Sequence, residues 1–110
     1  MTSENIIQSE IFKWYHNNFC TTNCKPQHII FSVPNGGTRN KLEAITMKAT
    51  GLVSGISDLI VVKPDEVVFV EVKNEIGIQS ENQKNFQKKI EAMGYRYLLI
   101  RSLNEFKEKI

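Results

Sequence analysis

The sequence predicts an α/β fold in which a small mixed β-sheet of about four strands is flanked by helices. Three observations support this fold class. Segments with apolar residues at helical spacing alternate along the chain with short β-branched runs. Two of these runs, residues 59–62 and 67–70, flank a tight-turn signal, which indicates an antiparallel hairpin. A later apolar run follows after one helical segment, and this strand–helix–strand order predicts a parallel pair.

Length and composition indicate a single domain spanning residues 1–110. Of the 110 residues, 41% are hydrophobic and 24% are charged, which is ordinary for a globular protein with one core. The chain has no apolar run of membrane-spanning length, and its start does not have the pattern of a signal peptide. We therefore expect a cytoplasmic protein without a membrane partner.

The net charge of +2 gives weak support for a nucleic-acid partner, and the distribution of charge is more informative. Residues 64–78 contain four acidic residues and one lysine, whereas residues 79–110 contain seven Lys or Arg and four Glu. An acidic centre beside a basic flank suits a metal site that accepts a polyanion. A solvated helix face explains the basic flank equally well.

Residues 3–19 are expected to form an amphipathic helix with Ile7, Ile11 and Trp14 on one stripe. Glu10 falls on the same stripe, where an unpaired buried carboxylate would be costly. Two interpretations of Glu10 remain open. It reaches water or a lysine from the edge of the stripe, or it supplies a further carboxylate to a metal site.

A short strand is expected over residues 28–33, and it ends in a strong turn signal. This signal consists of Pro34, Asn35, Gly36 and Gly37. Consecutive glycines let backbone N–H groups approach a phosphate, and Arg39 follows closely. A plain turn is the favoured interpretation. The alternative is a DNA-binding loop formed by Asn35, Gly36, Gly37 and Arg39.

A second helix is expected over residues 39–50, with Leu42, Ile45 and Ala49 facing inward and Gly51 ending it. The loop that follows leads to the start of the predicted hairpin.

A third helix is expected over residues 81–93, with Phe86 and Met93 among the residues of its apolar stripe. Ser80 and Gln83 have the spacing of a capping box, so Gln83 has a structural role available. The functional alternative is that Gln83 holds a lysine or a water molecule in place.

The last part of the chain predicts one strand and one helix. Residues 95–101 are apolar in the manner of an interior strand of a sheet. Ser102 and Glu105 have the spacing of another capping box, which opens a short final helix.

Cysteine and histidine residues form one evenly spaced series, His16, Cys20, Cys24 and His28. On a single continuous helix these four side chains could bind zinc. The intervening polar residues and Pro26 argue against such a helix, and the spacing matches no standard zinc module. Reduced thiols in a loop are the favoured interpretation.

The predicted hairpin carries the strongest functional signal. A turn centred between Pro64 and Asp65 places Asp58 opposite Glu71, and Lys73 then faces the same side. Two carboxylates held together on an apolar hairpin repel each other, and a divalent cation between them removes the repulsion. The lysine could activate water or balance the charge of a phosphate. A slip of one residue in the register would separate the carboxylates.

Asp58 followed by Glu71-Val72-Lys73 resembles the signature of the PD-(D/E)XK nuclease superfamily. Over nearly its whole length, the chain resembles a VRR-NUC (virus-type replication-repair nuclease) domain of that superfamily. The matching segments are Glu10 and residues 34–39, 51–58, 70–73, 80–83, 94 and 101–102. One departure is Ser57, where the family usually has proline. We expect a minor effect, because proline only favours the extended backbone that a strand already supplies.

The resemblance implies a restriction-endonuclease-like core and a deoxyribonuclease that uses Mg²⁺ or Mn²⁺. It assigns Asp58, Glu71, Glu10 and the Val72 carbonyl to the metal, Lys73 as the catalytic lysine and Gln83 as its polar partner. Small stand-alone members from phages and bacteria resemble Holliday-junction resolvases and act as homodimers. We therefore expect a homodimer that cuts branched DNA in a bacterial or phage-infected cell.

Two other classes of function remain open at this point. The chain could be a DNA-binding module on a nuclease-like fold that has lost catalysis. It could also be a structural α/β domain in which the carboxylate pair is accidental.

Overall fold

The computed structural model describes residues 2–34 and 41–110. The elements in chain order are α1 (Glu4–Phe19), β1 (Ile29–Ser32), α2 (Lys41–Ala49), β2 (Leu59–Val62), β3 (Val67–Val72), α3 (Glu81–Ala92), β4 (Arg96–Ile100) and α4 (Leu103–Lys109). The predicted α/β class is confirmed. No helix in the described ranges has the length and apolar character needed to cross a membrane.

The four strands form one mixed sheet in the order β1-β2-β3-β4. β2 pairs with β1 and with β3 in antiparallel orientation, and β3 pairs with β4 in parallel. In the hairpin, Leu59 lies opposite Val70 and Val62 lies opposite Val67, which is the predicted register. The parallel pair after the α3 crossover is also as predicted.

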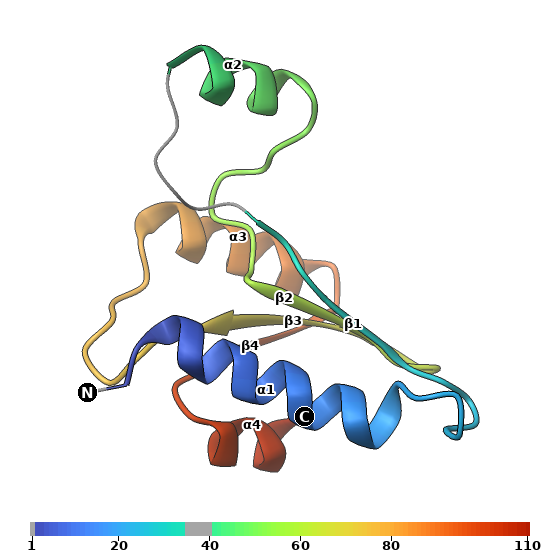
Figure 1. The fold of residues 1–110 in the computed structure, drawn as a ribbon. Coiled ribbons are helices and arrows are strands. Elements are labelled where there is room, and N and C mark those ends of the chain that lie inside the picture. Colours follow the sequence, from blue (N-terminus) through green and yellow to red (C-terminus); the bar gives the residue numbers. More distant parts are fainter. Residues whose placement is uncertain (1, 35–40) are drawn as a thin grey trace.

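The position of β4 differs from the prediction of an interior strand, because β4 lies at an edge of the sheet. Its apolar sequence has another cause. Helix α3 covers one face of the sheet, whereas α1 and α4 cover the other (Figure 1). A strand with helices over both faces needs apolar residues on both sides, whether or not it has two strand neighbours.

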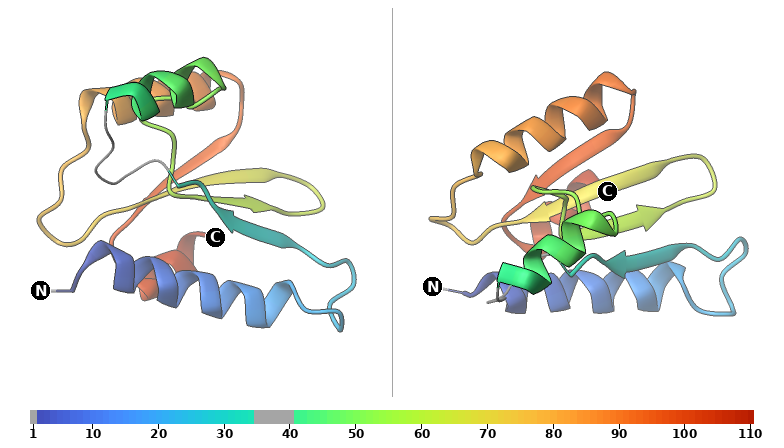
Figure 2. Two further views of the ribbon diagram at one scale, coloured as in Figure 1. Left: turned by 45° about the horizontal axis from the view of Figure 1, so that its top comes forward. Right: turned by 90° about the horizontal axis from the view of Figure 1, so that it is seen from above.

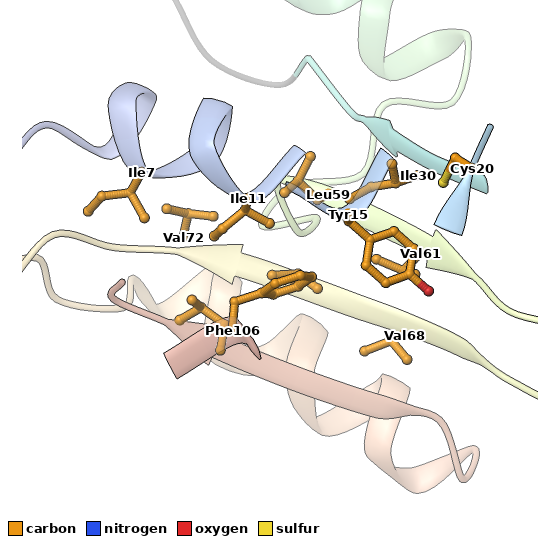
Figure 3. Close-up of a cluster of buried hydrophobic side chains, with 12 residues drawn as sticks. Ile7, Ile11, Tyr15, Cys20, Ile30, Leu59, Val61, Val68, Val72 and Phe106 are labelled. Carbon is orange, nitrogen blue, oxygen red and sulfur yellow. The ribbon is translucent and has the colours of Figure 1, made fainter. Parts of the chain in front are cut away.

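The main core lies between the sheet and the layer formed by α1 and α4 (Figure 3). Helix α1 begins at Ser3, whose hydroxyl accepts a hydrogen bond from the Ile6 N–H. It buries Ile7, Ile11 and Tyr15, which recur at intervals of one helical turn. Trp14, which was predicted on this stripe, is only partly buried and packs against the edge of the core.

On the opposite face, α3 begins with the predicted capping box. The Ser80 hydroxyl accepts from the Gln83 N–H at 3.2 Å, and the Gln83 side chain accepts from the Ser80 N–H at 2.8 Å. Phe86 packs against the Phe69 ring at a centroid distance of 5.8 Å. Met93 is 64% exposed, so the buried stripe ends one turn earlier than predicted.

The capping box predicted for α4 is only half formed. The Ser102 hydroxyl accepts from the Glu105 N–H at 3.1 Å, as expected. The Glu105 carboxylate instead accepts from the Arg101 N–H at 2.7 Å, one residue before the cap. The backbone N–H that this carboxylate satisfies therefore belongs to Arg101, the residue after β4, and not to the cap residue Ser102.

Helix α2 differs most from the prediction. Leu42 is 76% exposed and Ile45 is 55% exposed, although both were expected to face inward. No other helix or strand of the described chain packs its backbone against α2, and the helix projects from the body of the molecule (Figures 1 and 2). Helical spacing selects a face of a helix, but it does not supply a surface to cover that face.

Candidate active site

The hairpin brings Asp58 and Glu71 to adjacent strands. Asp58 directly precedes β2, and Glu71 lies near the end of β3, one position beyond the Leu59–Val70 pair. The Asp58 Oδ2 atom accepts a hydrogen bond from the Val72 N–H at 2.7 Å. Because that N–H is on β3, the Asp58 carboxylate is held across the gap between the two strands.

Glu71 is a fully buried carboxylate. Its Oε1 atom accepts hydrogen bonds from the Tyr97 hydroxyl and from the Gln79 side-chain amide. Its Oε2 atom is buried and has no hydrogen-bond partner among the residues that the structure describes. A buried carboxylate oxygen without a donor is unfavourable unless a positive charge comes to it.

Lys73 supplies one positive charge beside this oxygen. Its Nζ atom lies 3.8 Å from Glu71 Oε2, and its side chain is 13% exposed. This distance makes an ion pair without a hydrogen bond. The arrangement leaves the Glu71 oxygen available for a further ligand.

The two acidic side chains interact electrostatically. Burial raises the pKa of Asp58 above its ordinary value, and the Val72 N–H offsets part of that rise. The charge of Glu71 raises the same pKa, the charge of Lys73 lowers it, and Glu4 raises it again. Asp58 is therefore within electrostatic reach of Glu71, Lys73 and Glu4.

Glu4, in the first turn of α1, lies near Lys73 and was not among the residues predicted for the site. A Cβ atom added to Gly77 would lie 2.9 Å from Glu4 Oε2 and 3.1 Å from Lys73 Cδ, so these two side chains flank Gly77. The signal was present in the sequence. Glu4 lies three residues before Ile7 and belongs to the stripe that continues through Ile11 and Tyr15.

Glu10, the glutamate predicted for the site, lies elsewhere. Its side chain is exposed, and it lines a different cavity together with Glu75 and Arg101. The prediction assigned Trp14 to the buried stripe, whereas Tyr15 occupies that position. This shift of one residue rotates the buried face of α1. Glu4 then falls on the buried stripe, and Glu10 falls outside it.

Gln83 makes the structural contact available to it, because its side-chain oxygen caps Ser80. It also lines a polar cavity with residues 52–56. The amide that reaches Glu71 belongs to Gln79, whose Nε2 atom lies 3.2 Å from Oε1. Gln79 precedes the helix, and sequence periodicity gives no facing direction for a loop residue.

Gly55 lets the loop before Asp58 approach the first turn of α3. Its φ is +79°, and an added Cβ atom would lie 2.2 Å from the Asn82 carbonyl oxygen. No side chain fits at that separation without a backbone shift. The close approach fixes where the chain turns before it enters β2.

The structure gives no support to the predicted DNA-binding loop or to the zinc alternative. Asn35, Gly36, Gly37 and Arg39 lie outside the described residues. The zinc alternative gains nothing, because no group of three or more His, Cys, Asp or Glu side chains in residues 2–34 and 41–110 could hold a metal ion. His28 is instead 2.7 Å from the Tyr15 hydroxyl through Nδ1.

A hard divalent cation fits the residues that are brought together. Mg²⁺ is usually bound by one or two carboxylates and keeps several water molecules. Asp58 and Glu71 supply two carboxylates, and the Oε2 atom of Glu71, which accepts no hydrogen bond from the described residues, has a lone pair available to a cation. The Val72 N–H is used by Asp58, and its carbonyl stays a predicted ligand.

Comparison with known proteins shows the family of the chain. The VRR-NUC domain family matches residues 2–104. A solved structure described as a VRR_NUC domain protein superposes with a TM-score of 0.75 at 17% identity, covering 98% of this chain and 84% of that one. No match was found among curated proteins. The family match extends over almost the entire chain, and the chain therefore belongs to the VRR-NUC family of PD-(D/E)XK-type nucleases.

Proposed function

We propose that this protein is a Mg²⁺- or Mn²⁺-dependent deoxyribonuclease that hydrolyses phosphodiester bonds, with residues 1–110 as one nuclease domain. The observation that carries this proposal is the Oε2 atom of Glu71. It is buried without a hydrogen-bond donor in the described part of the chain, it lies 3.8 Å from the Lys73 ammonium, and the charges of Glu71 and Asp58 interact. Membership in a nuclease family supports the same chemistry.

Asp58 and Glu71 would hold the metal, with the Val72 carbonyl as a further ligand. When bound, a divalent cation lowers the pKa of a coordinated water and polarises the scissile phosphate. The hydrogen bond from the Val72 N–H keeps Asp58 turned towards β3, and the contacts to Oε1 keep Glu71 from rotating. Both carboxylates are thus oriented before any substrate binds.

Lys73 would act on the reacting phosphate. Its ammonium group lies next to the carboxylate pair, where it can hold the attacking water or stabilise negative charge that develops on a phosphate oxygen. We propose that Glu4 acts through a water molecule or through Lys73 and not as a third direct ligand, because it flanks Gly77 together with Lys73, and no group of three acidic side chains in the described residues could hold a metal ion. Glu10 and Gln83, which were predicted from the sequence, are not proposed as direct participants. Glu10 is exposed, and the side-chain oxygen of Gln83 caps Ser80.

The substrate that we propose is branched DNA, such as a Holliday junction, and the active form is a homodimer. Two strands at a junction require two sites, which a two-fold dimer presents and a single small subunit does not. The basic flank over residues 79–110 and the segment with Arg39 are the proposed contacts to phosphate. The protein would act in the cytoplasm of a bacterial or phage-infected cell.

A cleavage panel tests this proposal. Branched, flap and linear DNAs are incubated in Mg²⁺ or Mn²⁺ with the wild type, with Lys73→Ala and with Lys13→Ala, which changes an exposed lysine on α1. We expect Lys73→Ala to lose about 100-fold or more of the cleavage rate, and Lys13→Ala to cut like the wild type. Equal cleavage by Lys73→Ala would contradict the assignment.

The main alternative, an inactive DNA-binding module, predicts a different result in the same panel. The wild type would then bind branched DNA in the presence of metal and yield no product. Retention of Asp58, Glu71 and Lys73 together speaks against this alternative, because loss of activity usually removes one of the three charges. A purely structural domain would show no metal-dependent rise in melting temperature.

A further inference from the structure

We infer that Tyr97 and Gln79 confine Glu71 to binding a cation through a single oxygen, and that they thereby set the preference of the site for Mg²⁺ over Ca²⁺. This inference rests on the proposed metal-dependent function. It concerns groups that touch neither the substrate nor the cation, so both are positioning residues.

The two carboxylate oxygens of Glu71 differ in their hydrogen bonds. The Oε1 atom accepts two hydrogen bonds, from the Tyr97 hydroxyl and from Gln79 Nε2. A carboxylate oxygen has two lone pairs in the plane of the group, so both are used. The Oε2 atom accepts no hydrogen bond from residues 2–34 or 41–110. Only one of the two oxygens can therefore turn a lone pair to an ion.

Neighbouring side chains fix the orientation of the Gln79 amide. Gln87 Nε2 lies 3.4 Å from Glu91 Oε2, which leaves Gln87 Oε1 to face Gln79 at 2.8 Å. Gln79 must meet that oxygen with its NH₂ group. The same NH₂ group carries a second hydrogen, and this one points to Glu71. A reversed amide would place oxygen against oxygen at both contacts.

The loop that carries Gln79 is held by hydrogen bonds. Arg101 Nη1 donates to the carbonyl oxygens of Asn74 at 2.6 Å and Gly77 at 2.9 Å. The Asn74 side chain also accepts from the Gly77 N–H at 2.9 Å. These bonds hold the chain between the end of β3 and the start of α3, so Gln79 approaches Glu71 from a fixed direction.

Tyr97 closes the remaining side. It lies in β4, next to β3 in the parallel pair, and its side chain is buried. The Phe86 ring packs against the Tyr97 ring with centroids 6.3 Å apart. The hydroxyl therefore cannot swing away from Glu71 without a shift of the α3 layer.

The consequence for metal choice follows from coordination chemistry. Mg²⁺ requires near-octahedral geometry, keeps several waters and is satisfied by single carboxylate oxygens, whereas Ca²⁺ takes more ligands and commonly binds carboxylates through both oxygens. A Glu71 that offers only Oε2 suits the smaller ion. Removing a hydrogen bond to Oε1 would allow Glu71 to bind a cation through both oxygens, and the site would then bind Ca²⁺ more tightly relative to Mg²⁺.

The experiment compares Tyr97→Phe and Gln79→Leu with the wild type and with Tyr95→Phe. The control makes the same chemical change two residues away, at a side chain that is 45% exposed. Binding of Mg²⁺ and of Ca²⁺ to the full chain is measured separately by calorimetry. The metal-induced rise in melting temperature provides a second readout, and both are independent of DNA cleavage. The melting temperature without metal shows that each variant is folded.

We expect Tyr97→Phe and Gln79→Leu to raise the ratio of Ca²⁺ to Mg²⁺ affinity by about tenfold, since contacts of this kind change metal affinity by roughly 10–100-fold. Tyr95→Phe should leave the ratio unchanged. If wild type binds metal and the ratio stays constant in both variants, this inference is overturned and the nuclease proposal stands. If the wild type binds neither ion, both fail.

Discussion

Helices α1 and α2 both have apolar residues at helical spacing, but of the two only α1 packs against other described helices and strands. Helix α1 buries Ile7, Ile11 and Tyr15 under the sheet and carries Glu4, which flanks Gly77 together with Lys73. Helix α2 leaves Leu42 and Ile45 exposed, and no element of the described chain packs on it. The difference comes from topology. α1 precedes the sheet and forms one of its layers, whereas α2 is part of a connection between two neighbouring strands.

This comparison separates two kinds of structural requirement. The site depends on α1, the hairpin and the α3 layer, because these elements supply Glu4, Asp58, Glu71 and the contacts that orient Glu71. The α2 segment is not needed to build the core. Its exposed apolar residues are free to serve a contact outside the described chain, and the proposed homodimer is one such contact.

The largest expected effect is on the buried helix. Ile11 is fully buried, so Ile11→Ala removes core contacts and leaves a cavity. We expect the free energy of unfolding to fall by about 3 kcal/mol, measured by urea denaturation. Loss of less than about 1 kcal/mol would mean that the α1 layer is not a true part of the core.

The second largest effect is expected where the α2 connection meets α3. Gly55→Ala introduces a Cβ atom 2.2 Å from the Asn82 carbonyl oxygen, at a φ of +79°. We expect a loss of stability of about 2 kcal/mol, together with slower cleavage because Asp58 is three residues away in sequence. Thermal melts and cleavage rates measure the two effects. Stability and cleavage equal to wild type would show that the loop does not need to touch α3.

A smaller effect is expected from the two glutamates of α1. Glu4→Gln should weaken Mn²⁺ binding by about tenfold, whereas Glu10→Gln should bind like the wild type because Glu10 is exposed and lines another cavity. A calorimetric titration of each variant measures this. The reverse result would restore the assignment predicted from the sequence.

The smallest effect is expected on α2. Ile45→Ala makes the same change as Ile11→Ala at a side chain that is 55% exposed. The free energy of unfolding of the monomer should change by less than about 0.5 kcal/mol. If Ile45→Ala instead lowers the stability, and the loss grows as the protein is diluted, α2 lies in the interface of an oligomer.

The hairpin and the layers of the fold could be predicted from the sequence because their causes are local. The turn between Pro64 and Asp65 fixes the pairing of β2 with β3, and the crossover through α3 fixes the parallel pair. The placement of Asp58 opposite Glu71 could be predicted from that register. The position of Lys73 on the same face as Glu71 could be predicted from the alternation of side chains along a strand.

The remaining features depend on contacts between distant residues. A change of one residue in the buried stripe, from Trp14 to Tyr15, turns α1 so that Glu10 is exposed, whereas Glu4 lies beside Gly77 with Lys73. The contact of Gln79 with Glu71 depends on how a loop is anchored by Arg101. The exposure of Leu42 depends on the absence of a partner for α2 in the described chain, which helical spacing does not report.

The central claim is that Asp58 and Glu71 share one divalent cation. Calorimetric titration of Mn²⁺ into the wild type, Asp58→Asn and Glu71→Gln tests it most directly. We expect one saturable site in the wild type, weakened about tenfold or more by each substitution. Wild-type affinity in either variant would contradict a shared site, because a shared ion must respond to the loss of either ligand.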